Sequence, residues 1–274
     1  MSDWFAKTQG PAAHETRGKT AQHRLRRLDR FLHAFEPGLL SRSGAVAVDL
    51  GYGRVPITTI EWFERAKKNH PDLRMVGIER EPERVKAAEA MLTPALIESG
   101  LGFRLGDFNM PLKAGESVVL TRAMNVLRQY EESAAVDAHA LILNQMAAGG
   151  LLAEGTCDPF GRRMVVALLR KSSEGVRCEG VLFACSLREP IEPRGFQAVL
   201  PKHLIHRMVE GEAIHDFFSV WDRAAATTRG QAEFGNRQHF VAAAEALAQT
   251  VKGIETRRAW LRNGWLFWRG APYP

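Results

Sequence analysis

The sequence predicts an α/β fold in which a mostly parallel sheet lies between two layers of helices. Three observations support this prediction. Apolar runs of strand length alternate with amphipathic stretches of helix length from about residue 44 to residue 155. The first run, AVAVDL, is followed by two glycines that flank a tyrosine, and then by a proline suited to the first turn of a helix. After residue 155 the chain continues with two β-rich runs separated by KSSEG, which predict an antiparallel hairpin.

The elements of the first half follow in order. The polar residues 1–20 predict an arm with little core of its own, and an amphipathic helix is expected from about residue 20 to residue 35. Its arginines, Arg24, Arg26, Arg27 and Arg30, lie mostly off the apolar stripe, which favours a solvated face. Strands are expected at 45–50, 73–78, 101–105, from 117 onward and at 150–154; helices are expected at 56–69, 83–99 and 131–146. Pro94 is expected to kink or end the second of these helices. Such alternation implies parallel strands joined by right-handed crossovers.

The second half is less regular. The hairpin strands are expected at 164–170 and 176–187, and the region from Pro201 to Thr250 is expected to be helical. The tail IETRRAWLRNGWLFWRG predicts a short terminal hairpin around Asn263-Gly264. Its arginines and aromatic residues can stack nucleic-acid bases, although such residues more often pack a terminal strand against the core.

Composition excludes several classes of protein. The chain has 274 residues and a net charge of +6, which permits an anionic partner but is more often a matter of solubility. Its three cysteines have no metal-ligand spacing, so reduced thiols in a cytoplasmic protein are expected, and no metal site is. The first residues lack the apolar segment of a signal peptide, and no apolar run reaches the ~18 residues that a membrane span needs. Oligomeric state leaves no signal in the sequence.

The glycine turn after the first strand predicts a nucleotide-like ligand, because neither Gly51 nor Gly53 carries a Cβ that would keep a ligand away. A dinucleotide fingerprint requires a third glycine where this chain has Pro56, which disfavours NAD. A phosphate-binding P-loop is excluded because no Gly-Lys-Ser/Thr follows.

Four spaced signals between Gly44 and Gly155 resemble the class I S-adenosylmethionine (SAM)-dependent methyltransferases. They are DLGYG after the first strand, Glu79 after the second, Gly106-Asp107-Phe108 after the third, and Thr121-Arg122-Ala123 with Asn125 after the fourth. A third glycine that the family often has is replaced here by Val55. The resemblance implies a Rossmann-like three-layer sandwich with added C-terminal helices.

The resemblance also implies roles for these residues. Glu79 would accept hydrogen bonds from both ribose hydroxyls, Asp107 would bind the adenine amino group, and Phe108 would pack near the ring. Asp49 would support the loop, while Tyr52 packs on the cofactor or points into the crevice. Residues after the fourth strand would line the methionine end. The full set expected at the cofactor is Asp49, Gly51, Tyr52, Gly53, Glu79, Arg80, Asp107, Phe108, Arg122 and Asn125.

Each signal also has a structural interpretation: a tight turn, a surface acid or a helix cap. Their order, one at each strand end on one edge of the sheet, favours the ligand site. The parts of the chain are then a basic arm and helix (1–43), a SAM-binding core (44–190) and a mainly helical region on the substrate side (191–274). The leading helix is expected to cover the cofactor, with Arg17 and Arg27 near its carboxylate.

The catalytic residues are not assigned by the sequence. The candidate histidines are His203, His206, His215 and His239, none of which is singled out. Cys157 would need an activating environment to act as a nucleophile. The sequence therefore predicts a SAM-dependent methyltransferase with an unidentified, small-molecule acceptor. The alternatives are a catalytically inactive SAM- or nucleic-acid-binding protein of the same fold and, less favoured, an NAD-dependent oxidoreductase.

Overall fold

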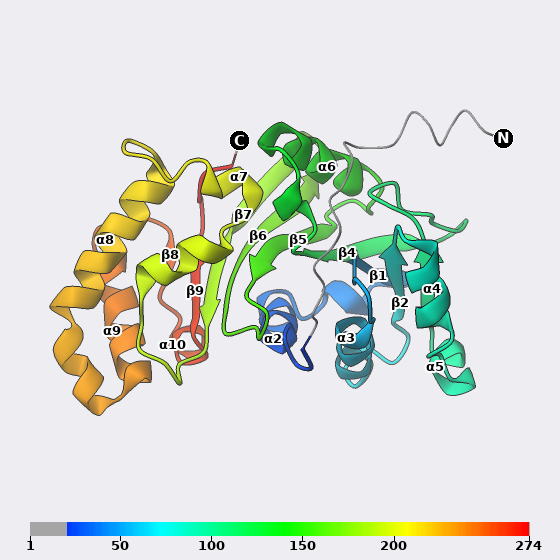
Figure 1. Cartoon of the computed structure of the whole chain (residues 1–274), viewed down its shortest axis with the longest axis horizontal. Helices are drawn as coiled ribbons and strands as arrows, with labels where there is room; N and C mark the ends of the chain where they lie inside the picture. Colours follow the sequence, from blue (N-terminus) through cyan, green and yellow to red (C-terminus); the bar gives the residue numbers. More distant parts are fainter. Residues whose placement is uncertain (1–20, 274) are drawn as a thin grey trace.

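The computed structural model describes residues 21–273, which form one nine-stranded sheet covered by helices on both faces (Figure 1). The strands are β1 (Ala45–Leu50), β2 (Arg74–Glu79), β3 (Leu101–Leu105), β4 (Ser117–Met124), β5 (Leu151–Cys157), β6 (Arg163–Ser172), β7 (Gly175–Cys185), β8 (Ile254–Glu255) and β9 (Trp265–Trp268). The helices are α2 (Arg26–Phe35), α3 (Ile57–Lys67), α4 (Pro82–Glu89), α5 (Pro94–Glu98), α6 (Glu132–Asn144), α7 (Lys202–Ile205), α8 (Ala213–Thr227), α9 (Asn236–Ala248) and α10 (Arg258–Leu261).

The sheet has the order β3-β2-β1-β4-β5-β6-β7-β9-β8. Neighbouring strands from β3 to β5 are parallel, whereas β6, β7, β9 and β8 pair antiparallel with their neighbours. From β1 the chain adds β2 and β3 on one side of the sheet and then returns to add β4 and β5 on the other side. The direction in which successive strands are added therefore reverses between β1 and β4. This confirms the predicted fold class, including the antiparallel hairpin after the fifth strand.

Two hydrophobic cores lie on the two faces of the sheet. Every residue of β1 is buried, as expected for a parallel strand covered on both sides. One core packs α2 and α3 against the sheet through residues such as Phe31 and Trp62. The other packs α6, α8 and α9 through residues such as Ile142, Phe217 and Phe240. The result is the expected three-layer sandwich.

Pro94 ends the predicted helix 83–99 and begins another. The structure has α4 up to Glu89 and then α5, in which Pro94 occupies the first turn. The side chain of Thr93 caps α5 by accepting a hydrogen bond from the Leu96 backbone N–H at 3.3 Å. Proline at this position loses no hydrogen bond, because the N–H groups of a first turn have no partner within the helix.

The terminal hairpin around Asn263-Gly264 was predicted wrongly. Strands β8 and β9 do pair, but α10 lies between them, and Gly264 follows this short helix with a φ of +75°. Strand β9 pairs with β7 on its other side, so the tail extends the main sheet. Its aromatic residues are buried, with Trp265 and Phe267 on one face and Trp268 on the other, and are not available to stack bases.

The C-terminal region shares its core with the preceding sheet. Buried residues from β1, β7, α8 and α9 belong to one apolar cluster. Between residues 21 and 273, no helix has both the length and the apolar character needed to cross a membrane.

Candidate functional site

The carboxyl ends of β1 to β4 place the sequence-predicted residues at one edge of the sheet. Leu50 at the end of β1 pairs with Ile78 of β2 and with Ala123 of β4. Glu79 in turn pairs with Leu105, the last residue of β3. The residues that follow these strands therefore meet where open α/β sheets bind their ligands.

The glycine loop after β1 depends on both of its glycines. Gly51 and Gly53 have φ angles of +68° and +82°, which side-chain-bearing residues rarely adopt. A Cβ on Gly51 would lie 2.7 Å from Cγ2 of Val126, so the loop packs tightly against the residues after β4. Gly53 has no atom within 4 Å of its Cβ position. The loop is thus tightly packed against protein at Gly51 and has free space beside Gly53.

Glu79 joins this loop to the end of β2. Its Oε2 accepts a hydrogen bond from the Gly53 backbone N–H at 2.9 Å, and its Oε1 accepts one from the Arg80 backbone N–H at 3.0 Å. The Arg84 guanidinium lies 3.7 Å from Oε1. A carboxylate has about four acceptor positions, so these two hydrogen bonds fix its orientation and occupy only part of its acceptor capacity, while Arg84 lies beside Oε1.

Asp107 and Phe108 follow β3. Asp107 is half-buried and accepts a hydrogen bond from the Phe108 backbone N–H at 2.9 Å. The Phe108 ring is buried edge-on against Tyr130, with 5.4 Å between the ring centroids. Burial and the nearby Asp107 raise the pKa of Tyr130, whereas Arg80 opposes the shift. Arg80 therefore lies close to this aromatic pair.

Tyr52 lies within the core and not on an open surface. Its ring packs edge-on against Phe103 with 5.1 Å between centroids, in a small cluster with Val85 and Ala88 of α4. Burial raises the pKa of Tyr52, and the Glu79 carboxylate adds to the shift. The contact of Tyr52 with a cofactor stays a prediction, and the structure shows its ring packed against β3 and α4.

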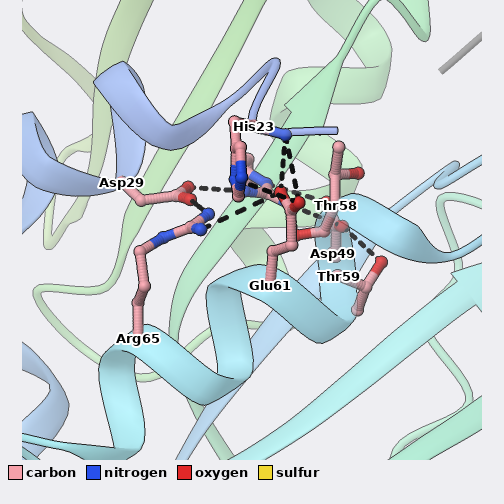
Figure 2. A network of polar contacts seen from close by, with 8 residues as sticks. His23, Asp29, Asp49, Thr58, Thr59, Glu61 and Arg65 are labelled. Carbon is pink, nitrogen blue, oxygen red and sulfur yellow. Dashed lines mark hydrogen bonds and ion pairs between the residues drawn. The ribbon is translucent and has the colours of Figure 1, made fainter. Parts of the chain in front are cut away.

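Asp49, at the end of β1 directly before the loop, forms a buried ion pair with Arg122. Figure 2 shows Asp49 together with Asp29, Thr59 and Arg65 in the same polar network. Arg122 donates from Nε to Asp49 Oδ1 at 3.0 Å and from Nη2 to Asp49 Oδ2 at 2.6 Å. The same oxygen of Asp49 accepts a hydrogen bond from the Thr59 hydroxyl at 2.6 Å, which ties the ion pair to the first turns of α3. Because the Arg122 side chain is 0% exposed, its guanidinium faces protein groups on all sides.

A second carboxylate completes this network. Asp29 of α2 accepts hydrogen bonds from both Arg122 and Arg65, and Arg122 also lies 4.4 Å above the Trp62 ring centroid. Burial opposes the charge of Arg122, but Asp49 and Asp29 together raise its pKa above the ordinary value. The network joins α2, α3, β1 and β4 and thereby supports the glycine loop from below.

The segment before α2 lies over the ends of β4 and β5. Arg24 donates from its guanidinium to Asn125 Oδ1, to Cys157 Sγ at 3.0 Å and to the Asp158 carbonyl at 3.2 Å. Asn125 has a φ of +64° and donates from Nδ2 to the Cys157 carbonyl at 3.0 Å. Sequence reasoning named Arg17 and Arg27 for this place. Arg17 lies outside the described residues, and Arg27 donates to the Gly161 carbonyl.

Cys157 does not have the environment of a nucleophile. Its thiol is buried, and burial raises its pKa to about 11 although the Arg24 guanidinium opposes the shift. The thiol is therefore protonated at neutral pH, which makes it a poor nucleophile.

A cavity of about 220 Å³ opens between α2 and α3, away from the strand ends. Its lining residues are equally divided between apolar and polar or charged ones, and it reaches Leu120 and Leu151 in the first halves of β4 and β5. Neither Glu79 nor Asp107 borders it. This cavity is consequently not the predicted ligand site.

Gly161 offers a test of the cover formed by Arg24. It has a φ of +68°, and a Cβ there would lie 1.9 Å from the Arg24 carbonyl oxygen. We expect Gly161→Ala to displace residues 21–25 and to speed trypsin cleavage after Arg24 and Arg26. Gly44→Ala is the matched control, because Gly44 has a φ of +69° and no atom within 4 Å. In both variants the strained backbone should lower the free energy of unfolding by about 1 kcal/mol. Equal cleavage rates in the two variants would contradict the close packing of Gly161 against Arg24.

No protein-family model matches the chain, and no curated protein sequence matches it. The chain is similar over part of its length to several solved structures. One is LepI in complex with SAM, at 22% identity over 41% of this chain and 26% of that chain, with a TM-score of 0.34. Another is a protein of Galdieria sulphuraria described as a putative sarcosine dimethylglycine methyltransferase, at 16% identity over 47% of this chain and 46% of that chain, with a TM-score of 0.37.

A third is the sugar N-methyltransferase KedS8 of a Streptoalloteichus species, at 18% identity over 62% of this chain and 78% of that chain, with a TM-score of 0.37. The chain spans between about a quarter and a half of the first two of these structures. These similarities concern the α/β fold alone. What the site can do has to be argued from the residues at the strand ends.

Proposed function

We propose that this protein is a SAM-dependent methyltransferase that acts on a small-molecule acceptor. The observation that carries the proposal is the Glu79 carboxylate at the end of β2, which accepts hydrogen bonds from the backbone N–H groups of Gly53 in the glycine loop and of Arg80. An acceptor-only group that keeps acceptor capacity beyond these two hydrogen bonds suits two neighbouring hydroxyl donors. A ribose with free 2′ and 3′ hydroxyls presents this pair.

The neighbouring residues fit the rest of such a cofactor by their chemistry. Asp107 would accept a hydrogen bond from the adenine amino group, and Phe108 supplies an apolar surface beside it. The open space at Gly53 leaves room for a ligand next to the loop. Asp49 and Arg122 would support the glycine loop and not contact the cofactor, since their charges are already paired with each other. The residues proposed to contact the cofactor directly are therefore those of the glycine loop and those at the ends of β2, β3 and β4.

Arg24 and Asn125 stand where the methionine end of the cofactor would lie. A guanidinium is suited to a carboxylate, which it can bind through two parallel hydrogen bonds. We therefore assign to Arg24 the contact with the cofactor carboxylate that was expected of Arg17 and Arg27. When bound, SAM supplies a methyl group on a sulfonium for in-line displacement, and the protein contributes mainly by positioning.

The test is calorimetric binding of SAM, S-adenosylhomocysteine and NAD to the purified chain. We expect both sulfur compounds to bind and NAD not to bind. Glu79→Gln should weaken binding of S-adenosylhomocysteine about 10- to 100-fold, because the charged acceptor of two hydroxyls is lost. The circular dichroism spectrum of the variant will show whether the loop change has affected folding.

Glu81→Gln is the matched control. This glutamate is two residues away, is 51% exposed, and contacts the exposed Arg80 side chain at 3.6 Å. Its substitution should change the affinity less than twofold. Binding of NAD alone, or equal affinities for the wild type and Glu79→Gln, would overturn the proposal.

A further inference from the structure

Three chemically reactive side chains meet inside the protein on the α6 face of the sheet. His139 comes from α6, Glu154 from β5 and His203 from α7, and their exposures are 0%, 1% and 1%. None was expected at the cofactor, and the sequence predicted no metal site. The cluster does not depend on the proposed function.

The ligand atoms are close to the spacing of a metal centre. His139 Nε2 lies 3.5 Å from Glu154 Oε2, and His203 Nδ1 lies 3.7 Å from the same oxygen. One atom from each of the three residues can be chosen so that all lie within 4.8 Å of one another. Around a tetrahedral zinc ion with bonds of 2.0–2.2 Å, ligand atoms lie about 3.4 Å apart. Small side-chain movements would therefore close the site around one ion.

Between residues 21 and 273, these atoms have no hydrogen-bond partner. Neither oxygen of Glu154, neither ring nitrogen of His203, nor Nε2 of His139 makes a hydrogen bond within that part of the chain. The separations of 3.5 and 3.7 Å are too long for strong hydrogen bonds between the side chains themselves. Buried polar atoms almost always have a partner, and an unpaired buried carboxylate is especially unfavourable. Five such atoms in one place need a binding partner that the described residues do not provide.

A neighbouring side chain orients one residue of the cluster, as hydrogen bonds to metal-ligating histidines do in known metal sites. His139 Nδ1 lies 3.0 Å from the Tyr273 hydroxyl, and this hydrogen bond directs Nε2 towards Glu154. Arg207, whose positive charge acts on His203, lies 3.5 Å from Glu132 and 3.4 Å from Glu212. These two carboxylates balance its charge, so Glu154 remains the acid available to a cation.

We propose that His139, Glu154 and His203 bind one divalent transition-metal ion, with Zn²⁺ as the preferred ion. Two imidazoles and one carboxylate are ligands that zinc accepts, and harder ions such as Mg²⁺ favour oxygen-only sites. The ion would join α6, α7 and β5 within the core. Its role is structural, because all three ligands are closed off from solvent.

The experiment uses the untagged full chain, stripped with a chelator and dialysed against Zn²⁺ or Co²⁺. We expect one ion per chain by elemental analysis and a higher melting temperature of the Zn²⁺-loaded protein. Glu154→Gln and His203→Gln should weaken Zn²⁺ binding by more than about 100-fold, since they remove ligands and not only supporting contacts. His239→Gln should leave binding unchanged, because that buried histidine already contacts the Ala225 carbonyl at 2.8 Å.

If the variants fail to fold, X-ray absorption spectroscopy of the Co²⁺-loaded wild type tests which atoms bind the ion. A coordination shell of nitrogen and oxygen with two imidazoles would support the proposal. Absence of stoichiometric metal in the wild type, a sulfur ligand, or full binding by a folded Glu154→Gln variant would overturn it.

Discussion

Replacing Arg122 with methionine is expected to lower the free energy of unfolding by about 3–5 kcal/mol at pH 7.5, because it leaves buried carboxylates without their main counter-charge. Arg122 is fully buried between Asp29 and Asp49. After the substitution Asp49 keeps only the Thr59 hydroxyl among its side-chain partners, and Asp29 keeps Arg65. Methionine fills similar space beside Trp62, so most of the loss is electrostatic. Urea denaturation followed by circular dichroism measures it.

The loss should depend on pH. Burial raises the pKa of Asp29 in the folded protein, and Arg122 followed by Arg65 opposes that shift. Without Arg122 the folded-state pKa rises further above the unfolded value, so the folded state holds protons that the unfolded state releases. Stability then falls as the pH rises. The difference between the variant and the wild type should therefore be smaller at pH 5.5 than at pH 7.5.

Arg65→Met is the control within the same network. Its side chain is 24% exposed, and Asp29 retains Arg122 when it is removed. We expect a loss of about 1 kcal/mol, as for partly exposed ion pairs. A loss equal to that of Arg122→Met, or a loss that does not change with pH, would contradict the assignment of Arg122 as the central charge.

The sequence predicted best what depends on local pattern. The alternation of strands and helices and the glycine turn depend on neighbouring residues, so the sheet and the edge at which its carboxyl ends meet follow from them. The residue types at the strand ends also follow, because parallel strands bring their carboxyl ends together. Their contacts do not. Arg122 follows the pattern of a ligand-facing residue, but Asp29, which lies 93 positions earlier, determines where its guanidinium points.

Long-range packing explains the other differences. The arginine-bearing segment was expected to have a solvated face, yet Arg24 reaches Asn125 and Cys157 across more than 100 residues of sequence. His203 was one of four undistinguished histidines, and His139 was not considered. Their meeting with Glu154 depends on α6 and α7 packing on the same face of β5, which no sequence spacing reveals.

Trp221→Ala is expected to lower the free energy of unfolding by about 3–5 kcal/mol, as large-to-small changes in a packed core do. Trp221 of α8 is completely buried. Its ring stacks on Phe196 at 5.2 Å between centroids and meets the edge of Phe183 of β7 at 5.6 Å. The side chain therefore joins the helical C-terminal region to the main sheet. Urea denaturation followed at wavelengths for helix and for tertiary structure measures the effect.

The shape of that transition bears on the division of the chain at residue 190. Because one apolar cluster extends from β1 to α9, we expect the variant to unfold in a single transition with both signals coincident. Phe234→Ala removes an aromatic ring that is 73% exposed and should change stability by less than about 0.5 kcal/mol. Two separate transitions in Trp221→Ala, the later one matching the wild-type midpoint, would instead mean that residues 191–274 unfold as an independent unit. Coincident loss would show that the sheet, including the edge where Glu79 and Asp107 lie, relies on the C-terminal helices for its stability.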